Sequence, residues 1–118
     1  MKLLLDTHVF LWWRLDSRRL NRPAREMIAT ADIVWVSAAS AWEVAIKSTL
    51  GRLELDQPFG FMVDDSDFSP MDVAFAHAER VGMLPAHHAD PFDRMLVAQA
   101  LVEGATLVTH DRRLKPYD

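Results

Sequence analysis

Four acidic residues have the type and placement to do chemistry together. The first directly follows the apolar run 3–5, and the last follows the run 106–109. Another comes one short turn after the β-branched run 33–36, and the remaining one lies in the sequence DPFDRML. The four residues are Asp6, Glu43, Asp93 and Asp111. Because ligands in parallel α/β sheets bind beyond the carboxyl ends of the strands, we expect these acids to share one edge.

Carboxylates gathered at one edge repel each other unless a cation lies between them. Oxygen ligands in a chain without cysteine favour a hard divalent ion such as Mg²⁺ or Mn²⁺. Such a site supports metal-assisted hydrolysis of a phosphodiester, in which one or two ions activate water and no histidine base is needed. The sequence does not show whether one ion or two would bind.

Each acid taken alone also has a structural interpretation. Asp6 and Asp111 can cap a helix or end a strand, and Ser40 with Glu43 has the form of a capping box. Asp90 has the form of an N-cap because Pro91 follows it, which places Asp93 three residues into the helix. Helix caps are common, so each acid alone is more often structural than catalytic. Four caps need not converge, however, and their predicted convergence favours a site.

The elements that must position these acids alternate between strand and helix. Strands are predicted at 3–5, 33–36 and 106–109. Helices are predicted from Thr7, from an N-cap at Asn21, from Ser40 to a stop at Gly51, over 71–81, and from Pro91 to Gly104. The stretch 51–70 is expected to be a connection with a short helix. This order predicts an α/β fold of the Rossmann-like kind, with a central parallel sheet flanked by helices.

The predicted helix from Ser40 has a helical pattern of apolar residues. We expect its buried stripe to consist of Trp42, Ala45, Ile46, Thr49 and Leu50.

Length and composition fit one ordinary globular domain over residues 1–118. There is no cysteine, which suits a reducing compartment such as the cytoplasm. No apolar run approaches the ~20 residues that a membrane helix needs. The net charge of −4 does not by itself suggest nucleic acid, although arginines cluster at 18–25 and 112–113. Those clusters suit solvated surface and phosphate binding equally well.

The chain resembles PIN-domain proteins, and closely the VapC ribonuclease toxins of bacterial toxin–antitoxin pairs. The resemblance covers nearly the whole length and rests on four blocks, of which the two central ones are highly specific. They are LLDTH (4–8), VSAASAWEVAIK (36–47), LP (84–85) through HADPFDRMLVAQA (88–100), and LVTHD (107–111).

The resemblance implies a metal-dependent endoribonuclease that cleaves RNA with Mg²⁺ or Mn²⁺. Its acids map onto Asp6, Glu43, Asp93 and Asp111, and Thr7 and Thr109 match supporting polar positions. It also implies a homodimer, with higher toxin–antitoxin assemblies, and a cognate antitoxin (VapB-like) whose C-terminal segment occupies a groove near the acids. The RNA target is not implied.

Several other residues invite an assignment. The pair His87 and His88 is a poor zinc site, because adjacent histidines seldom share one ion. His77 is expected to be packed or on the surface, and packing is favoured over a site role for His8. Core or dimer packing is favoured over base stacking for most of the tryptophans, Trp12, Trp13, Trp35 and Trp42. Arg94, with Arg112 and Arg113, is the candidate for phosphate contacts.

Two rival functions remain to be compared with the nuclease. A haloacid-dehalogenase-like phosphatase needs a second aspartate two residues after the first, where this chain has His8. A non-cleaving RNA- or protein-binding PIN-like module would use the acids only as caps. Such a module should function in EDTA, whereas the nuclease should lose cleavage and keep its fold.

Overall fold

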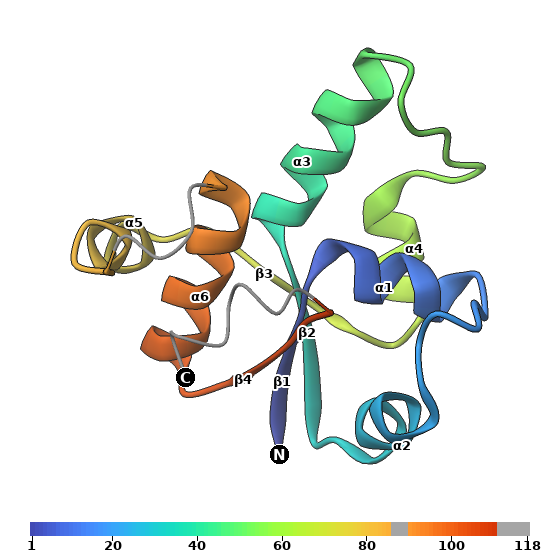
Figure 1. Cartoon of the computed structure of the whole chain (residues 1–118), viewed down its shortest axis with the longest axis horizontal. Coiled ribbons are helices and arrows are strands. Elements are labelled where there is room, and N and C mark those ends of the chain that lie inside the picture. The colour runs from blue at the N-terminus through green and yellow to red at the C-terminus, as the bar shows by residue number, and fades with distance from the viewer. Residues whose placement is uncertain (86–89, 111–118) are drawn as a thin grey trace.

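The computed structural model describes residues 1–85 and 90–110 and shows four parallel strands with helices on both faces (Figure 1). The strands are β1 (Lys2–Leu5), β2 (Ile33–Ser37), β3 (Ser69–Met71) and β4 (Thr106–Val108). Their order across the sheet is β3-β2-β1-β4, and all three neighbouring pairs are parallel. The predicted α/β parallel architecture is confirmed.

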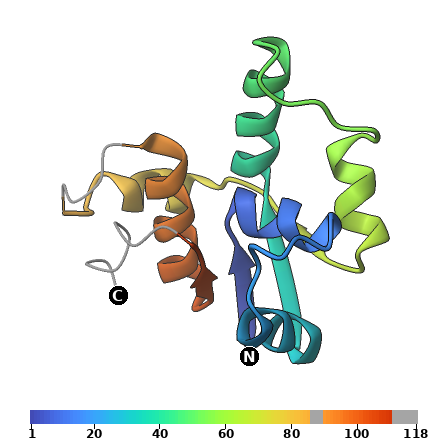
Figure 2. The same cartoon turned by 45° about the vertical axis from the view of Figure 1, so that its right-hand side comes forward.

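Six helices connect or follow these strands in the described residues (Figures 1 and 2). They are α1 (Thr7–Arg14), α2 (Arg22–Thr30), α3 (Ala38–Thr49), α4 (Phe59–Asp65), α5 (Phe75–Val81) and α6 (Pro91–Glu103). None of them is long and apolar enough to cross a lipid bilayer.

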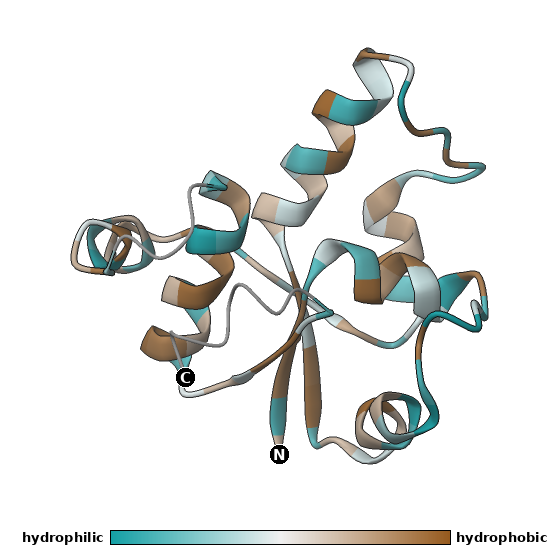
Figure 3. Cartoon of the chain, viewed as in Figure 1, coloured by the Kyte–Doolittle hydropathy of each residue, from teal (hydrophilic) through white to brown (hydrophobic). Residues whose placement is uncertain are grey.

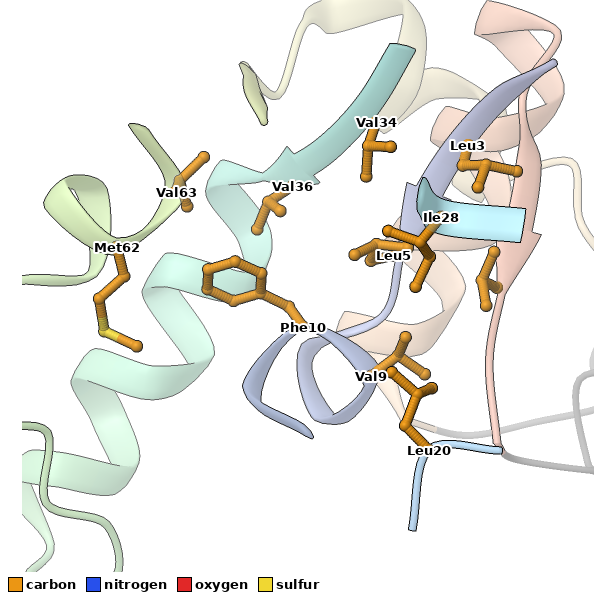
Figure 4. Close-up of a cluster of buried hydrophobic side chains, with 11 residues drawn as sticks. Leu3, Leu5, Val9, Phe10, Leu20, Ile28, Val34, Val36, Met62 and Val63 are labelled. Atoms are coloured by element: carbon orange, nitrogen blue, oxygen red, sulfur yellow. The ribbon is translucent and has the colours of Figure 1, made fainter. Parts of the chain in front are cut away.

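The alternation of side chains along the strands divides the core into two layers. Leu3 and Leu5 face one layer, whereas Leu4, between them, faces the other. On the first side, Phe10 of α1 lies between Val36 of β2 and Met62 of α4 (Figure 4). On the second side, Leu4 packs with residues of α6. Hydrophobic colour accordingly dominates the two central strands (Figure 3).

Several predicted helix ends are confirmed. Asn21 caps α2 by accepting a hydrogen bond from the Ala24 amide at 2.9 Å, with Pro23 in the first turn. Asp90 caps α6 by accepting from the amides of Phe92 and Asp93. Gly104 ends α6 in the left-handed conformation, with φ of 66°. The predicted short helix in the connection 51–70 is α4.

Two predicted elements require correction. The stretch 71–81 is not one helix: Met71 ends strand β3, and α5 begins only at Phe75. Strand β3 has three residues, lies at the edge of the sheet and contains Pro70. Three residues are too few to show the alternating pattern by which a strand is recognised in a sequence. Helix α3 begins at Ala38 rather than Ser40, because the Ser37 hydroxyl caps it by accepting from the Ala39 amide at 3.0 Å.

The predicted buried stripe of α3 is also wrong. Trp42 is 64% exposed, and Ala45, Ile46, Thr49 and Leu50 are exposed as well. The buried face of this helix instead consists of Ala39, Ser40, Glu43 and Val44. Hydrophobic periodicity assigns the apolar face of a helix to the core. In α3 the face with Ser40 and Glu43 is buried and the more apolar face is exposed, so this assignment is wrong.

Candidate functional site

Asp6 lies between β1 and α1 and is buried, with 3% of its surface exposed. One carboxylate oxygen, Oδ1, caps α1 by accepting from the Val9 amide at 2.7 Å. The other, Oδ2, accepts from the Thr109 hydroxyl at 2.6 Å and lies 3.2 Å from Nδ1 of His110. The capping interpretation of Asp6 is therefore right, but the cap uses only one oxygen. The second oxygen faces the segment that follows β4, at the carboxyl edge of the sheet.

Glu43 reaches the same edge from α3 and is also buried, at 8% exposed. Its Oε1 accepts from the hydroxyl of Thr7, the residue after Asp6, at 2.7 Å. Its Oε2 accepts from the Lys47 ammonium at 2.9 Å, one helical turn along. The capping-box interpretation of Glu43 is wrong, because Ser37 is the N-cap of α3.

Thr7 links the two buried acids. A hydroxyl has one proton, and the short contact with a carboxylate is the stronger use of it. The Ser40 hydroxyl lies 2.9 Å from the Thr7 oxygen and completes this buried chain of polar groups. Thr7 and Ser40 are both almost fully buried, so the position of the Glu43 carboxylate is fixed by packed neighbours.

Asp93 lies in the first turn of α6 and is half-buried. Its helix is placed beside α3 by a ring contact, since Phe92 and Trp42 pack at 5.1 Å between centroids. Each of these rings immediately precedes one of the predicted acids, Asp93 and Glu43. The structure thus sets the first turn of α6 against the turn of α3 that carries Glu43. The remaining predicted acid, Asp111, and also Arg112, lie outside the described residues.

The tightest group of potential metal ligands in the described residues differs from the predicted set of acids. Ligand atoms of Asp6, His8 and His110 all lie within 4.8 Å of one another, and this group includes neither Glu43 nor Asp93. The carboxylate suits Mg²⁺ or Mn²⁺, whereas the two imidazole nitrogens favour a transition ion. The donor types therefore fit a divalent ion, with Asp6 as the common member.

The predicted supporting residues have defined partners. Thr109 donates to Asp6, as described above. The guanidinium of Arg94 donates to the backbone carbonyls of Val81 and Pro85, at 3.1 and 2.9 Å. These contacts fasten α6 to the end of α5. The role of Arg94 in phosphate binding stays a prediction.

His77 proves to be a packed histidine, with 2% of its surface exposed. Its Nδ1 accepts from the Ala74 amide at 2.9 Å, so Nε2 carries the proton and donates to Glu103 at 2.7 Å. The first bond lies in the N-terminal turn of α5, and the second joins α5 to α6. The histidine pair at positions 87 and 88 lies outside the described residues.

The sequence analysis missed His110 as a potential ligand. Its only signal was its place one residue before Asp111, after a strand. Three of the four tryptophans, Trp12, Trp13 and Trp35, pack partly buried against the core, as expected, whereas Trp42 is exposed.

Comparison with known proteins places the chain in a family. The sequence matches the PIN domain family over residues 3–118, and the chain belongs to that family. It is 32% identical to Ribonuclease VapC22 of Mycobacterium tuberculosis, over 98% of this chain and 91% of that protein. The resemblance noted from the sequence blocks is confirmed.

Solved structures share the fold. The structure of VapBC2 from Rickettsia felis bound to a promoter DNA fragment matches with a TM-score of 0.73 at 17% identity. That match covers 99% of this chain and 93% of the other. A toxin–antitoxin complex from Klebsiella pneumoniae matches with a TM-score of 0.66 at 17% identity, covering 96% and 90%.

Proposed function

We propose that this protein is a metal-dependent endoribonuclease that acts as a toxin and is neutralised by a cognate antitoxin. The observation that carries the proposal is the buried pair of carboxylates, Asp6 and Glu43, joined through Thr7 at the carboxyl edge of the sheet. Burial of carboxylates is costly unless they have partners, and these two acids are 3% and 8% exposed. Membership of the PIN domain family and the likeness to a ribonuclease support the same function.

The side chains have separate tasks in the proposed reaction. Asp6, Glu43 and Asp93, with Asp111, would hold Mg²⁺ or Mn²⁺. When bound, the ion supplies activation of water and neutralisation of charge at the scissile phosphate. Thr109 orients Asp6, and Thr7 orients Glu43, so that both carboxylates are fixed before the substrate arrives. Fixed groups lower the cost of reorganisation during the reaction.

The partners belong to the same proposal. The matched structure from Klebsiella pneumoniae is a toxin–antitoxin complex, which supports an antitoxin partner here. An apolar groove between α3, α5 and α6 supports a protein partner independently. Its lining includes Trp42, Val73, Val81, Phe92 and Met95. We propose that the chain also forms a homodimer and acts in the cytoplasm, where RNA is available. Light scattering of the purified protein, alone and with its antitoxin, tests both assemblies.

Cleavage of total RNA by the purified protein tests the enzyme. We expect cleavage with Mg²⁺ or Mn²⁺, none in EDTA, and none by D93N. The D93N variant should keep its fold, because losing one carboxylate in the first turn of a helix costs about 1 kcal/mol. The matched control is D64N, which removes an exposed carboxylate on α4 and should cleave normally.

Two outcomes would contradict the proposal. Normal cleavage by D93N would show that the site is assigned wrongly. Unchanged RNA or protein binding in EDTA, without cleavage under any condition, would favour the non-cleaving binding module.

A further inference from the structure

Three aromatic rings gather beside the second oxygen of Asp6. The ring of His110 lies 4.8 Å from that of His8 and 4.9 Å from that of Trp12, between centroids. His8 and Trp12 are 6.1 Å apart on successive turns of α1. We call His8, Trp12 and His110 the ring cluster. It joins α1 to the segment that follows β4.

The ring cluster is anchored on one side and exposed on the other. Trp12 is half-buried and packs against the main hydrophobic core. His8 is exposed, and 41% of the His110 side chain is accessible to solvent. His110 also lies 3.2 Å from the carboxylate of Asp6 through its Nδ1. The cluster thus presents fixed rings to solvent directly beside a proposed metal ligand.

Among the residues that the structure describes, two cations near the buried acids have partners within the protein. The Lys47 ammonium is paired with Glu43, and the Arg94 guanidinium binds backbone carbonyls. The whole chain carries a net charge of −4. Contacts that do not depend on positive charge would therefore strengthen the binding of RNA near Asp6. Stacking of bases on aromatic rings is such a contact, and it is available to single strands whose bases are not already stacked in a duplex.

We propose that the ring cluster stacks a base of single-stranded RNA next to the phosphodiester that is cleaved. The proposal rests on the proposed ribonuclease function and adds to it the residues that position a base of the substrate. The alternative is purely structural: the rings would only hold the segment after β4 against α1. The two differ in what H8A should change: loss of stacking weakens binding of single-stranded RNA and leaves thermal unfolding unchanged, whereas loss of the tether to His110 lowers the unfolding temperature.

Binding can be measured without cleavage in the D93N background, which keeps the RNA intact. The probe is a short fluorescent single-stranded RNA of randomised sequence, with Mg²⁺ present, and the readout is the dissociation constant from anisotropy. The variants are H8A, H8F, W12L and W12F. The matched control is F75A, which removes a ring that is 88% exposed on α5, away from Asp6. Thermal unfolding of each variant checks the fold.

We expect H8A and W12L to weaken binding about tenfold, the loss typical of one stacked base. H8F and W12F should bind more tightly than H8A and W12L, because they keep a ring, and F75A should bind like the parent. In the cleaving protein, H8A should raise KM more than it lowers kcat. A duplex of the same length should bind more weakly than the single strand and should not respond to H8A.

Other results would overturn the inference. These are equal binding by H8A and the parent, equal losses in H8F and H8A, or no binding of the single strand by the parent. Failure of the wild-type protein to cleave total RNA with metal would instead overturn the proposed function. If the wild-type protein cleaves RNA and H8A has the same KM as the wild type, the stacking proposal is wrong and the ribonuclease function stands.

Discussion

Thr7 shows how one small side chain can fix the geometry of an acidic site. It is the buried first residue of α1, directly after Asp6, and its hydroxyl links α1 to Glu43 of α3. Without that hydroxyl, the Oε1 atom of Glu43 would lose its donor in a buried place, where an unpaired acceptor is costly. The structure therefore makes Thr7 a positioning residue for Glu43.

The substitution T7V tests this role, because valine has the shape of threonine without the donor. We expect the free energy of unfolding to fall by about 2 kcal/mol, the scale for a hydrogen bond to a charged group. RNA cleavage should fall at least tenfold, since Glu43 is no longer held. Urea unfolding and initial cleavage rates measure the two effects.

The control for T7V is T7S, which keeps the hydroxyl and should retain most of the cleavage. Wild-type cleavage by T7V would show that the orientation of Glu43 is set by Lys47 alone.

At the scale of residues, the sequence predicted the location of the acids better than it predicted their hydrogen-bond partners. Asp6 and Glu43 were placed at the correct edge because each follows a strand closely. Their hydrogen bonds to Thr109 and Thr7 join residues that are far apart in the chain, and no local pattern carries that information. His110 was missed for the same reason, since only the folded sheet brings it to Asp6.

Among the elements, helix α6 ends where its last turn needs a left-handed residue. Gly104 has φ of 66°, and a Cβ added there would meet no atom within 4 Å. The substitution G104A should therefore cost about 1 kcal/mol of unfolding free energy, entirely through backbone strain. Urea unfolding measures the loss.

Gly60 in α4 is the matched control, because it also has open space around its missing Cβ but no positive φ. G60A should leave stability unchanged or raise it slightly, since alanine is the better helix former. A loss in G60A equal to that in G104A would show that side-chain crowding, not backbone conformation, is responsible.

Most elements were predictable because each one carries a local signal. Apolar or β-branched runs predicted β1, β2 and β4, and capping residues predicted α2 and α6. The errors fall where local and tertiary signals disagree. In α3 the apolar face is exposed, and in β3 three residues contain too little pattern to be distinguished from a loop.

For the whole molecule, metal binding should raise the free energy of unfolding. The proposed ligands come from elements far apart in sequence, so an ion held between them binds the folded state only. Mn²⁺ at one hundred times its dissociation constant should add about 2.7 kcal/mol to the free energy of unfolding. Thermal unfolding with Mn²⁺ and with EDTA measures the shift.

D6N should abolish this response to Mn²⁺, and D64N should preserve it. EDTA should not unfold the protein, because the two hydrophobic layers of the core do not depend on the ion. An equal shift in D6N and the wild type would place the ion elsewhere.

The position of β4 in the sheet has a consequence for the timing of synthesis. Within the described part of the chain β4 pairs with β1 alone, and the Thr109 that follows it holds Asp6 across 103 positions of the sequence. A growing polypeptide exposes β1 first and β4 last of the four strands, and such distant pairing is slow to form. A half-made chain on the ribosome thus has Asp6 but not its partner. On the proposed function, the toxin would remain harmless to the message and ribosome that produce it until synthesis passes the final strand.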